Sequence, residues 1–421
     1  MINMDKLNLQ TLKGFRDFLP EDVKKRNYLK KKLIEMFELF GFEPLETPVL
    51  EYEEILLNKA GGEADKLLFS FEDLGGRKIA LRYDQTVPTA RVLAMNYHNL
   101  PMPWRRYQIQ HAYRAEKPQS GRFREFLHCD ADIYGSSSPV ADAEIISLVY
   151  KIYKSLGFEK FTIYINDRNI LFSIIEKVDI DSNLQLPVIT AIDKLDRKSE
   201  DEVTKDLVEL GVTKEQADHL FELLNNEKPT QFLNEVINTS TRLGVAPGIL
   251  KFEARLARGL DYYTSTIFEV KVTDYKFGSV LGGGRYDNLI KKLSGYNIPA
   301  VGFGLGFDRT LEAMEQLKLI PNLGKRKGVL VSVFNQYLAD ATMEVAQNLR
   351  ENGITTEIYP NEVVKLDKQL KYADKKFIKW FIVIGPNEVE NDRIILKNLE
   401  TGHQEDVKLS DLVNKIAGSK K

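Results

Sequence analysis

Apolar and polar residues alternate in two runs between residues 104 and 135, and this period of two predicts a pair of β-strands. A polar turn at residues 117–121 separates the runs, so we expect a hairpin with a loop longer than two residues. The second run places its apolar side chains on the face that would meet a core: Leu127, Cys129, Ala131 and Ile133. Its opposite face carries an aromatic ring, an imidazole and two carboxylates: Phe126, His128, Asp130 and Asp132.

Three arginines, Arg114, Arg122 and Arg124, stand at the mouth of this hairpin. A surface with cations at one end and carboxylates at the other suits a molecule with phosphates at one end and an amine at the other. The alternative is a solvated ion-pair face, in which each pair contributes little. A metal site is disfavoured, because the alternation points Cys129 away from His128 and the chain has no second cysteine.

The segment before the hairpin predicts mixed helix and strand. A period of 3.6 over residues 20–40 predicts a helix, and the two prolines of the extended segment 42–51 favour a sheet edge. A second hairpin is expected around residues 72–78, where two glycines form the turn. A further helix is expected from Pro88, with Thr86 as a candidate N-cap.

The segment after the hairpin changes from strands to helices and back. A helix at 140–156 and a strand at 161–165 precede a Leu- and Glu-rich, glycine-poor stretch at about 168–245, which predicts a helical insertion. A strand that ends in glycines then leads into a helix near Phe307. Arg309 falls in the first turn of that helix, where a cation opposes the helix dipole, and a phosphate bound at the N-terminus would account for it.

The pattern changes again after a basic linker at residues 325–328. Strand, helix, strand, helix and strand alternate between residues 328 and 384, which predicts a separate and mostly parallel α/β domain. No catalytic pattern is visible in this part. Lysines between residues 371 and 379 favour either phosphate contacts or an ordinary solvated helix face.

Composition fits a globular protein of two or three domains: 421 residues, of which 43% are hydrophobic and 29% charged. The single cysteine excludes an internal disulfide and suits a reducing compartment. No apolar run approaches bilayer length and no signal peptide is visible, so we expect a cytoplasmic protein without a membrane partner. The net charge of −2 neither supports nor excludes an RNA partner, which would need a local basic patch.

Several separate stretches resemble class II aminoacyl-tRNA synthetases, in the form found in histidyl-tRNA synthetases. YRAE at 113–116 with GRFREF at 121–126 is similar to the second class II signature, and AVGFGLGFDR at 300–309 to the third. RGLDYY at 258–263 resembles the signature specific to the histidyl enzymes, although an Arg258–Asp261 ion pair beside buried tyrosines is the alternative. The helix and Pro-containing strand at 20–51 resemble the first signature, which implies a homodimer interface.

The resemblance covers nearly the whole chain and implies its fold. We expect an α+β catalytic domain built on an antiparallel sheet at residues 1–325, with the helical insertion at about 168–245. A C-terminal α/β anticodon-binding domain is expected at residues 326–421. The insertion would lean on the tRNA acceptor arm, and the 117–121 loop would meet the acceptor end.

The resemblance also implies a histidine–tRNA ligase. L-histidine and ATP would form histidyl-adenylate and pyrophosphate, and the histidyl group would pass to the 3′ end of tRNA(His). Mg²⁺ would arrive with ATP, and no protein-bound metal is implied. Arg114 and Arg258 would supply the catalytic positive charge.

Binding residues follow from the same resemblance. The residues assigned to ATP are Arg114, Glu116, Arg122, Phe126 and Arg309. The residues assigned to histidine are Asp84, Gln85, Thr86, His128, Asp132, Arg258, Tyr262, Tyr263 and Tyr286. The glycines at 282–284 would let the backbone approach a ligand closely, although no P-loop pattern follows them.

One residue departs from the family pattern, since family members usually have glutamine at the position of His128. A glutamine side chain offers a donor and an acceptor, whereas a neutral imidazole offers one of each in fixed positions. A protonated His128 would repel the substrate ammonium, and we expect Asp132 to offset that charge. Two non-catalytic relatives are the alternatives: a histidine-binding regulatory subunit of ATP phosphoribosyltransferase, and a sensor of uncharged tRNA. The first typically lacks the C-terminal domain and the signature arginines, which this chain has.

Overall fold

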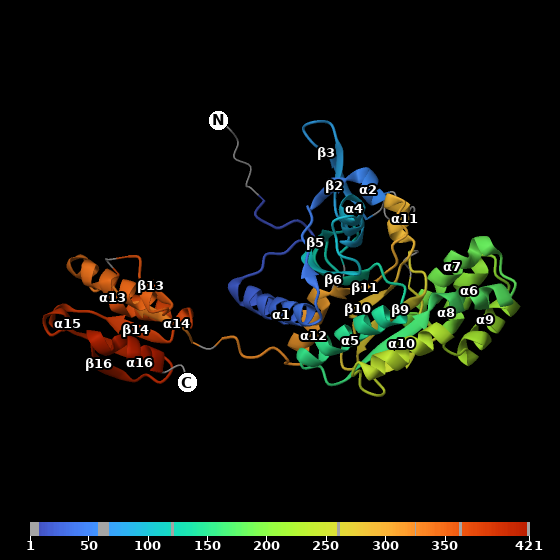
Figure 1. Cartoon of the computed structure of the whole chain (residues 1–421). Coiled ribbons are helices and arrows are strands. Elements are labelled where there is room, and N and C mark those ends of the chain that lie inside the picture. Colours follow the sequence, from blue (N-terminus) through green and yellow to red (C-terminus); the bar gives the residue numbers. More distant parts are fainter. Residues whose placement is uncertain are drawn as a thin grey trace. The chain divides into compact units, whose positions relative to one another are not determined.

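The computed structural model describes residues 8–57, 67–118, 122–258, 262–324, 326–361 and 364–418. The chain forms two compact units, Met1–Ile320 and Pro321–Lys421 (Figure 1). Lys325, where the expected linker begins, lies outside the described residues, and so does part of the 117–121 loop. Over the described ranges, no helix has both the length and the apolar character needed to cross a membrane.

A sheet of eight strands, as far as the described residues show, is the base of the first unit. Its order is β1-β5-β6-β11-β10-β9-β7-β8, and the six central strands pair antiparallel. The edge strands β1 and β8 pair parallel with their neighbours. The predicted α+β domain on an antiparallel sheet is therefore confirmed, with parallel pairs only at its margins. The strand bounds are β1 Glu43–Pro44, β5 Trp104–Tyr113, β6 Glu125–Tyr134, β7 Phe161–Asp167, β8 Leu250–Phe252, β9 Thr266–Val272, β10 Leu281–Arg285 and β11 Ala300–Gly306.

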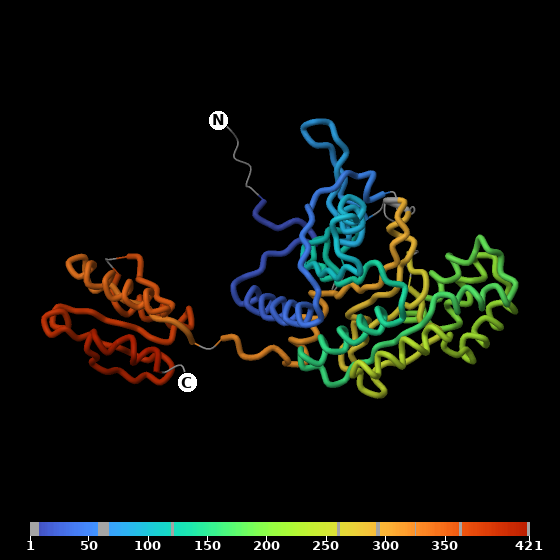
Figure 2. The backbone as a smooth tube through the Cα atoms, in the orientation of Figure 1, coloured from blue at the N-terminus to red at the C-terminus, as the bar shows by residue number. Residues whose placement is uncertain are grey.

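Helices cover one face of this sheet and form the main core with it. They are α1 Pro20–Leu39, α5 Pro139–Ser155, α10 Gln231–Arg242 and α12 Phe307–Gln316 (Figure 2). Phe37 and Ile146 from two of these helices are fully buried against the sheet. The apolar face of β6 lies in the same core, as the alternation predicts, so its polar face is left on the opposite side.

The helical insertion has an apolar cluster of its own. Helices α6 Arg168–Lys177, α7 Gln185–Ile192, α8 Glu200–Glu209 and α9 Lys214–Asn226 surround it. Reciprocal capping boxes at Ser199 and Thr213 fix where α8 and α9 begin. Helix α10 falls within the range expected for the insertion, but its Leu233 and Val236 belong to the main core. The separately packed part therefore ends before α10.

A three-stranded sheet of β2 Leu50–Tyr52, β4 Lys78–Leu81 and β3 Phe69–Glu72 leads to helix α4 Thr86–Asn96. The helix begins at Thr86, so the expectation that Pro88 opens it and Thr86 caps it is wrong. The Asp84 carboxylate instead accepts a hydrogen bond from the Val87 N–H at 3.2 Å. A short helix, α2 Glu53–Leu57, follows β2, and another, α11 Leu289–Ser294, follows β10.

The second unit contains a five-stranded sheet in the order β13-β12-β14-β15-β16. β12 pairs parallel with both β13 and β14, whereas β14, β15 and β16 pair antiparallel. The expected α/β domain is thus present, but its sheet is mixed, because the alternation that predicted parallel strands ends at residue 384. The bounds are β12 Val329–Val331, α13 Ala339–Glu351, β13 Thr356–Ile358, α14 Leu366–Lys375, β14 Trp380–Val383, α15 Pro386–Glu390, β15 Arg393–Asn398, β16 Gln404–Lys408 and α16 Leu412–Gly418.

Candidate active site

A cavity of about 1550 Å³ opens on the sheet face opposite the main core. Its size exceeds that of an ordinary small-molecule pocket, which leaves room for two substrates. Strands β6, β10 and β11, the start of α12 and the helical insertion all contribute to its wall. The predicted site residues that line it are Asp84, Thr86, Arg114, Glu116, Arg122, Phe126, His128, Asp132, Arg258, Tyr262, Tyr263, Tyr286 and Arg309. Arginines from three distant segments thus share one cavity.

Gln85 is the predicted site residue that does not line the cavity. Its side chain is fully buried, and its Nε2 donates to the backbone oxygens of Gln110 at 2.9 Å and His128 at 3.1 Å. These two bonds tie the start of α4 to strands β5 and β6. Gln85 therefore supports the wall of the cavity through its Nε2, and its contact with histidine stays a prediction.

Strand pairing builds one end of the cavity. The register between β5 and β6 places Gln110 opposite His128, Gln108 opposite Asp130, and Arg106 opposite Asp132. Arg106 Nη2 lies 2.6 Å from Asp132 Oδ2, and both side chains are buried. Sequence reasoning missed Arg106, although the same alternation in the first run places it on the polar face.

Asp132 is held by two partners. Besides Arg106, the Tyr286 hydroxyl donates to its carboxylate. Burial raises the pKa of Asp132 to about 6, although the Arg106 charge opposes the rise. Burial raises the pKa of Asp84 as well, opposed by the Val87 N–H. This end of the cavity therefore holds two carboxylates whose ionisation a bound cation would favour.

His128 has a different partner from the one expected. Its Nδ1 lies 2.9 Å from Asp130 Oδ1, whereas Asp132 is committed to Arg106 and Tyr286. Asp130, two residues along the same face of β6, is thus the direct partner of His128. Burial raises the pKa of Asp132, and a charge on His128 acts against that rise, so Asp132 also interacts with this charge. Because Nδ1 faces Asp130, Nε2 is the imidazole nitrogen that a ligand could reach.

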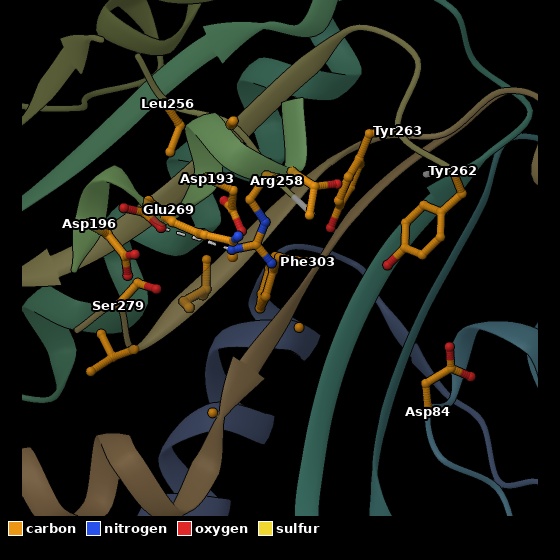
Figure 3. A pocket seen from close by; sticks show the side chains of 18 of the residues that line it. Asp84, Asp193, Asp196, Leu256, Arg258, Tyr262, Tyr263, Glu269, Ser279 and Phe303 are labelled. Atoms are coloured by element: carbon orange, nitrogen blue, oxygen red, sulfur yellow. Dashed lines mark ion pairs between the residues drawn. The ribbon is translucent and has the colours of Figure 1, made fainter. Parts of the chain in front are cut away.

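Arg258 occupies the middle of the cavity (Figure 3). Its Nη1 lies 4.0 Å from Glu269 Oε2, and Asp193 from the insertion lies close to its guanidinium in the figure. Burial alone would lower the pKa of Arg258, but Tyr263 and Glu269 outweigh it and the pKa is raised. Asp261, the alternative ion-pair partner from the sequence, lies outside the described residues.

The glycine run in β10 makes room for side chains. A Cβ on Gly282 would lie 2.0 Å from Arg258 Nη1, and a Cβ on Gly284 would lie 2.8 Å from Tyr263 Cδ1. The expected close approach is present: Arg258 and Tyr263 lie against these glycines, and Gly282 also lines the cavity. Because Gly282 has no side chain, Arg258 has room to lie against β10.

The other end of the cavity is cationic. Arg114 Nε donates to the Tyr83 backbone oxygen at 3.2 Å, and its guanidinium lies 5.2 Å from the centre of the Phe126 ring. Arg309 Nη1 donates to the Ser279 oxygen at 3.0 Å. Burial lowers the pKa of Arg309, and the nearby charge of Arg122 lowers it further. Among the described residues, no acidic side chain forms an ion pair with Arg114, Arg122 or Arg309, so this end suits a polyanion.

The sheet is antiparallel, and its β5–β6 hairpin and the helix that follows β11 direct arginines into one cavity. These features define the catalytic domain of a class II aminoacyl-tRNA synthetase. A family model described as histidyl-tRNA synthetase matches residues 14–310, and one described as an anticodon binding domain matches residues 328–418. The chain belongs to the histidyl-tRNA synthetase family.

Individual relatives agree with this assignment. The histidine–tRNA ligase of Rhodopirellula baltica is 38% identical over 424 residues, which cover 95% of this chain and 96% of that one. That of Clostridium tetani is 37% identical over 433 residues, which cover 96% and 97% of the two chains. The crystal structure of a Nostoc histidyl-tRNA synthetase superposes with a TM-score of 0.81 at 28% identity, covering 98% of this chain and 100% of that one.

A second similar structure bears on the non-catalytic alternative. It is a Bacillus halodurans protein titled as an ATP phosphoribosyltransferase regulatory subunit/histidyl-tRNA synthetase. Its TM-score is 0.73 at 22% identity, over 86% of this chain and 96% of that one. At that identity the likeness shows the fold alone.

Proposed function

We propose that this chain is a histidine–tRNA ligase that activates L-histidine with ATP and transfers the histidyl group to the 3′ end of tRNA(His). The observation that carries the proposal is the polarity of the cavity. Arg114, Arg122 and Arg309 line the cavity together with the buried carboxylates of Asp84, Asp130 and Asp132. Arg309 feels the charge of Arg122, whereas Asp84 feels the charges of His128, Asp130 and Arg114. ATP brings polyphosphate to the arginines, and the ammonium of histidine meets the carboxylates.

Arg258 lies between the two ends, where the carboxylate of histidine would attack the α-phosphate. A fixed guanidinium there stabilises the negative charge that grows on the α-phosphate, and Arg114 adds a second positive charge. Orientation and charge stabilisation suffice, so no covalent enzyme intermediate is required. Pyrophosphate then leaves. The terminal ribose hydroxyl of the tRNA attacks the histidyl carbonyl and loses its proton, the anhydride bond to the phosphate breaks, and AMP leaves.

The remaining contacts are those that the family resemblance implies, and their residues line the cavity. Phe126 stacks on the adenine, while Glu116, Arg122 and Arg309 position the phosphates. Asp84, Thr86, His128 and Asp132 receive the amino group, and the tyrosines Tyr262, Tyr263 and Tyr286 enclose the imidazole. Mg²⁺ in such sites is held by one or two carboxylates together with substrate phosphates, and the exposed carboxylate of Glu116 at this end fits an ion that arrives with ATP.

We further propose a cytoplasmic homodimer. The three-stranded sheet leaves Leu50, Tyr52 and Phe71 exposed, each by more than 40%. Apolar side chains of this size on one small sheet support a partner surface, and a second copy of the chain is the partner that the first class II signature implies. The second unit would bind the anticodon, and the 117–121 loop would meet the acceptor end.

The deciding experiment is ATP–pyrophosphate exchange with purified protein, Mg²⁺ and each amino acid in turn. We expect histidine to drive exchange and the other amino acids to fail. Exchange that no amino acid drives would leave the histidine-binding regulatory protein and the tRNA sensor as the remaining candidates. Exchange driven by another amino acid would overturn the assignment of the substrate.

A further inference from the structure

Arg16 connects the two sides of the cationic end without lining the cavity itself. It belongs to the segment before α1. Its guanidinium carbon lies 3.2 Å from the centre of the Phe123 ring, and its Nη2 lies 3.2 Å from Asp308 Oδ1. Phe123 directly follows Arg122, and Asp308 directly precedes Arg309. One side chain thus contacts the chain neighbours of two of the three phosphate-end arginines, Arg122 and Arg309.

The segment that carries Arg16 is itself fixed to the hairpin. The Gly14 oxygen accepts hydrogen bonds from the backbone N–H of Arg124 at 2.9 Å and of Glu125 at 3.4 Å. Gly14 has a φ of +91°, and a Cβ there would lie 2.8 Å from Arg124 Cγ. Only glycine fits this close approach without strain. Arg16 therefore starts from a backbone anchored beside the base of β6.

Asp308 is a shared anchor in a part-buried site. Arg26 of α1 also pairs with its Oδ1, at 2.5 Å, and stacks on Phe18 and Phe307 at 4.0 and 5.0 Å from the ring centres. The Asp308 side chain is only 13% exposed, so solvent screens these pairs less than surface pairs. Arg26 holds Asp308 from the helix side, whereas Arg16 links Asp308 to the hairpin.

The contacts of Arg16 restrain two arginines that repel each other. Arg122 and Arg309 repel each other across the cavity, and no described acidic side chain pairs with either of them. Arg122 is exposed near the hairpin loop, so repulsion and thermal motion would move it away from the position that a triphosphate needs. A misplacement of about 1 Å at such a contact can cost about a hundredfold in rate.

We propose that Arg16 is a positioning residue for the ATP phosphates, acting through Phe123 on Arg122 and through Asp308 on Arg309. The inference rests on the proposed function, since it assumes that this end of the cavity binds ATP. It assigns no contact with ATP to Arg16 itself. Its effect should therefore appear in ATP binding and leave histidine binding unchanged.

The test compares Arg16→Gln and Arg16→Lys with wild type in histidine-dependent exchange. For Arg16→Gln we expect the KM for ATP to rise about tenfold while the KM for histidine stays within about twofold. Arg16→Lys keeps the charge beside Asp308 but loses the planar stacking on Phe123, so it should rescue part of the loss. A double-mutant cycle with Asp308→Asn should be non-additive, because both changes break the same link.

The matched control is Lys25→Gln, which breaks an exposed 2.6 Å ion pair with Glu315 between α1 and α12, the two helices that the Arg26–Asp308 pair also joins. We expect its KM for ATP to stay within about twofold of wild type. The inference fails if Arg16→Gln leaves the KM for ATP unchanged, or if the KM values for ATP and histidine rise together. If Arg16→Gln does not fold, the KM values for ATP and histidine are compared in Arg16→Lys instead. If the wild-type protein shows no histidine-dependent exchange, the proposed function itself is wrong. Failure of the proposed function can therefore be told apart from failure of the inference about Arg16.

Discussion

The two ends of the cavity are built in different ways. At the amine end, Asp132 and Arg106 lie on paired strands, are buried, and neutralise each other. At the phosphate end, Arg114 and Arg309 donate to backbone oxygens, and none of the described acidic residues pairs with them. One end is complete within the protein, whereas the other has positive charge that a ligand would balance.

This difference indicates which end should tolerate change. A buried ion pair gives little net stability, but removing one partner leaves an uncompensated charge in the interior. A half-exposed arginine without a carboxylate partner can be removed at small cost to folding, since its main interaction is with the ligand. Mutations at the amine end should thus affect folding and binding together, and mutations at the phosphate end should affect binding alone.

The largest effect is expected for Asp132→Asn. The variant keeps the shape of the side chain but leaves the buried Arg106 without its carboxylate. The free energy of unfolding at pH 8 should fall, but by less than the ~3–5 kcal/mol of an ordinary buried pair, because burial already disfavours the ionised form of Asp132. The double variant Arg106→Met with Asp132→Leu should recover most of that stability, because no charge remains buried. It should still fail to activate histidine. A double variant as unstable as Asp132→Asn would contradict the comparison.

Arg309→Ala should lose exchange while remaining folded. We expect kcat/KM for ATP to fall by about a thousandfold, as for other removed donors to a developing anion. The unfolding midpoint should stay close to that of wild type. Gln316→Ala, at the exposed end of the same helix, is the matched control and should keep wild-type exchange. Exchange at near wild-type rate in Arg309→Ala would show that α12 does not hold the phosphates.

The pH dependence of stability tests the amine end without any ligand. Burial raises the pKa of Asp132 to about 6 from 3.8, so the folded state holds this proton more tightly than the unfolded chain does. The stabilising contribution is therefore full below pH 3.8 and is lost as the pH rises through 6, by about 3 kcal/mol. Denaturant unfolding followed at Trp104 in a Trp380→Phe background measures it. If the free energy of unfolding changes with pH equally in wild type and in Asp132→Asn between pH 4 and 6, the pKa of Asp132 is not raised.

Much of the fold could be predicted from the sequence, because alternation in β6 separates core residues from cavity residues one by one. The same rule, applied to β5, would have found Arg106, but a buried arginine is uncommon enough to be passed over. The pairing of Asp132 with Arg106 could not be predicted from one strand. It depends on the register between β5 and β6, and a shift of one residue would exchange the two faces. The partner of His128, by contrast, is Asp130, two residues along the same face of β6.

Other features depend on contacts between distant segments. Asp84 as a cap, Gln85 as a support and the approach of Asp193 to Arg258 follow from how α4 and the insertion pack against the sheet. The glycines of β10 gave a correct signal of close approach but not what approaches. The ligand assignments themselves came from the family resemblance, and the geometry adds where each residue lies along the cavity.

The smallest effect is expected at His128, where the chain departs from the family pattern. Its Nδ1 is held by Asp130 at 2.9 Å, so one imidazole nitrogen remains for the substrate, whereas glutamine offers both a donor and an acceptor. His128→Gln should lower the KM for histidine about two- to fivefold, the worth of one modest hydrogen bond, and leave the KM for ATP unchanged. His219→Gln, an exposed change on α9, should alter neither value. If His128→Gln instead raises the KM for histidine, the Asp130–His128 pair itself shapes the pocket. The amine end of this protein is then adapted to His128 in place of the usual glutamine.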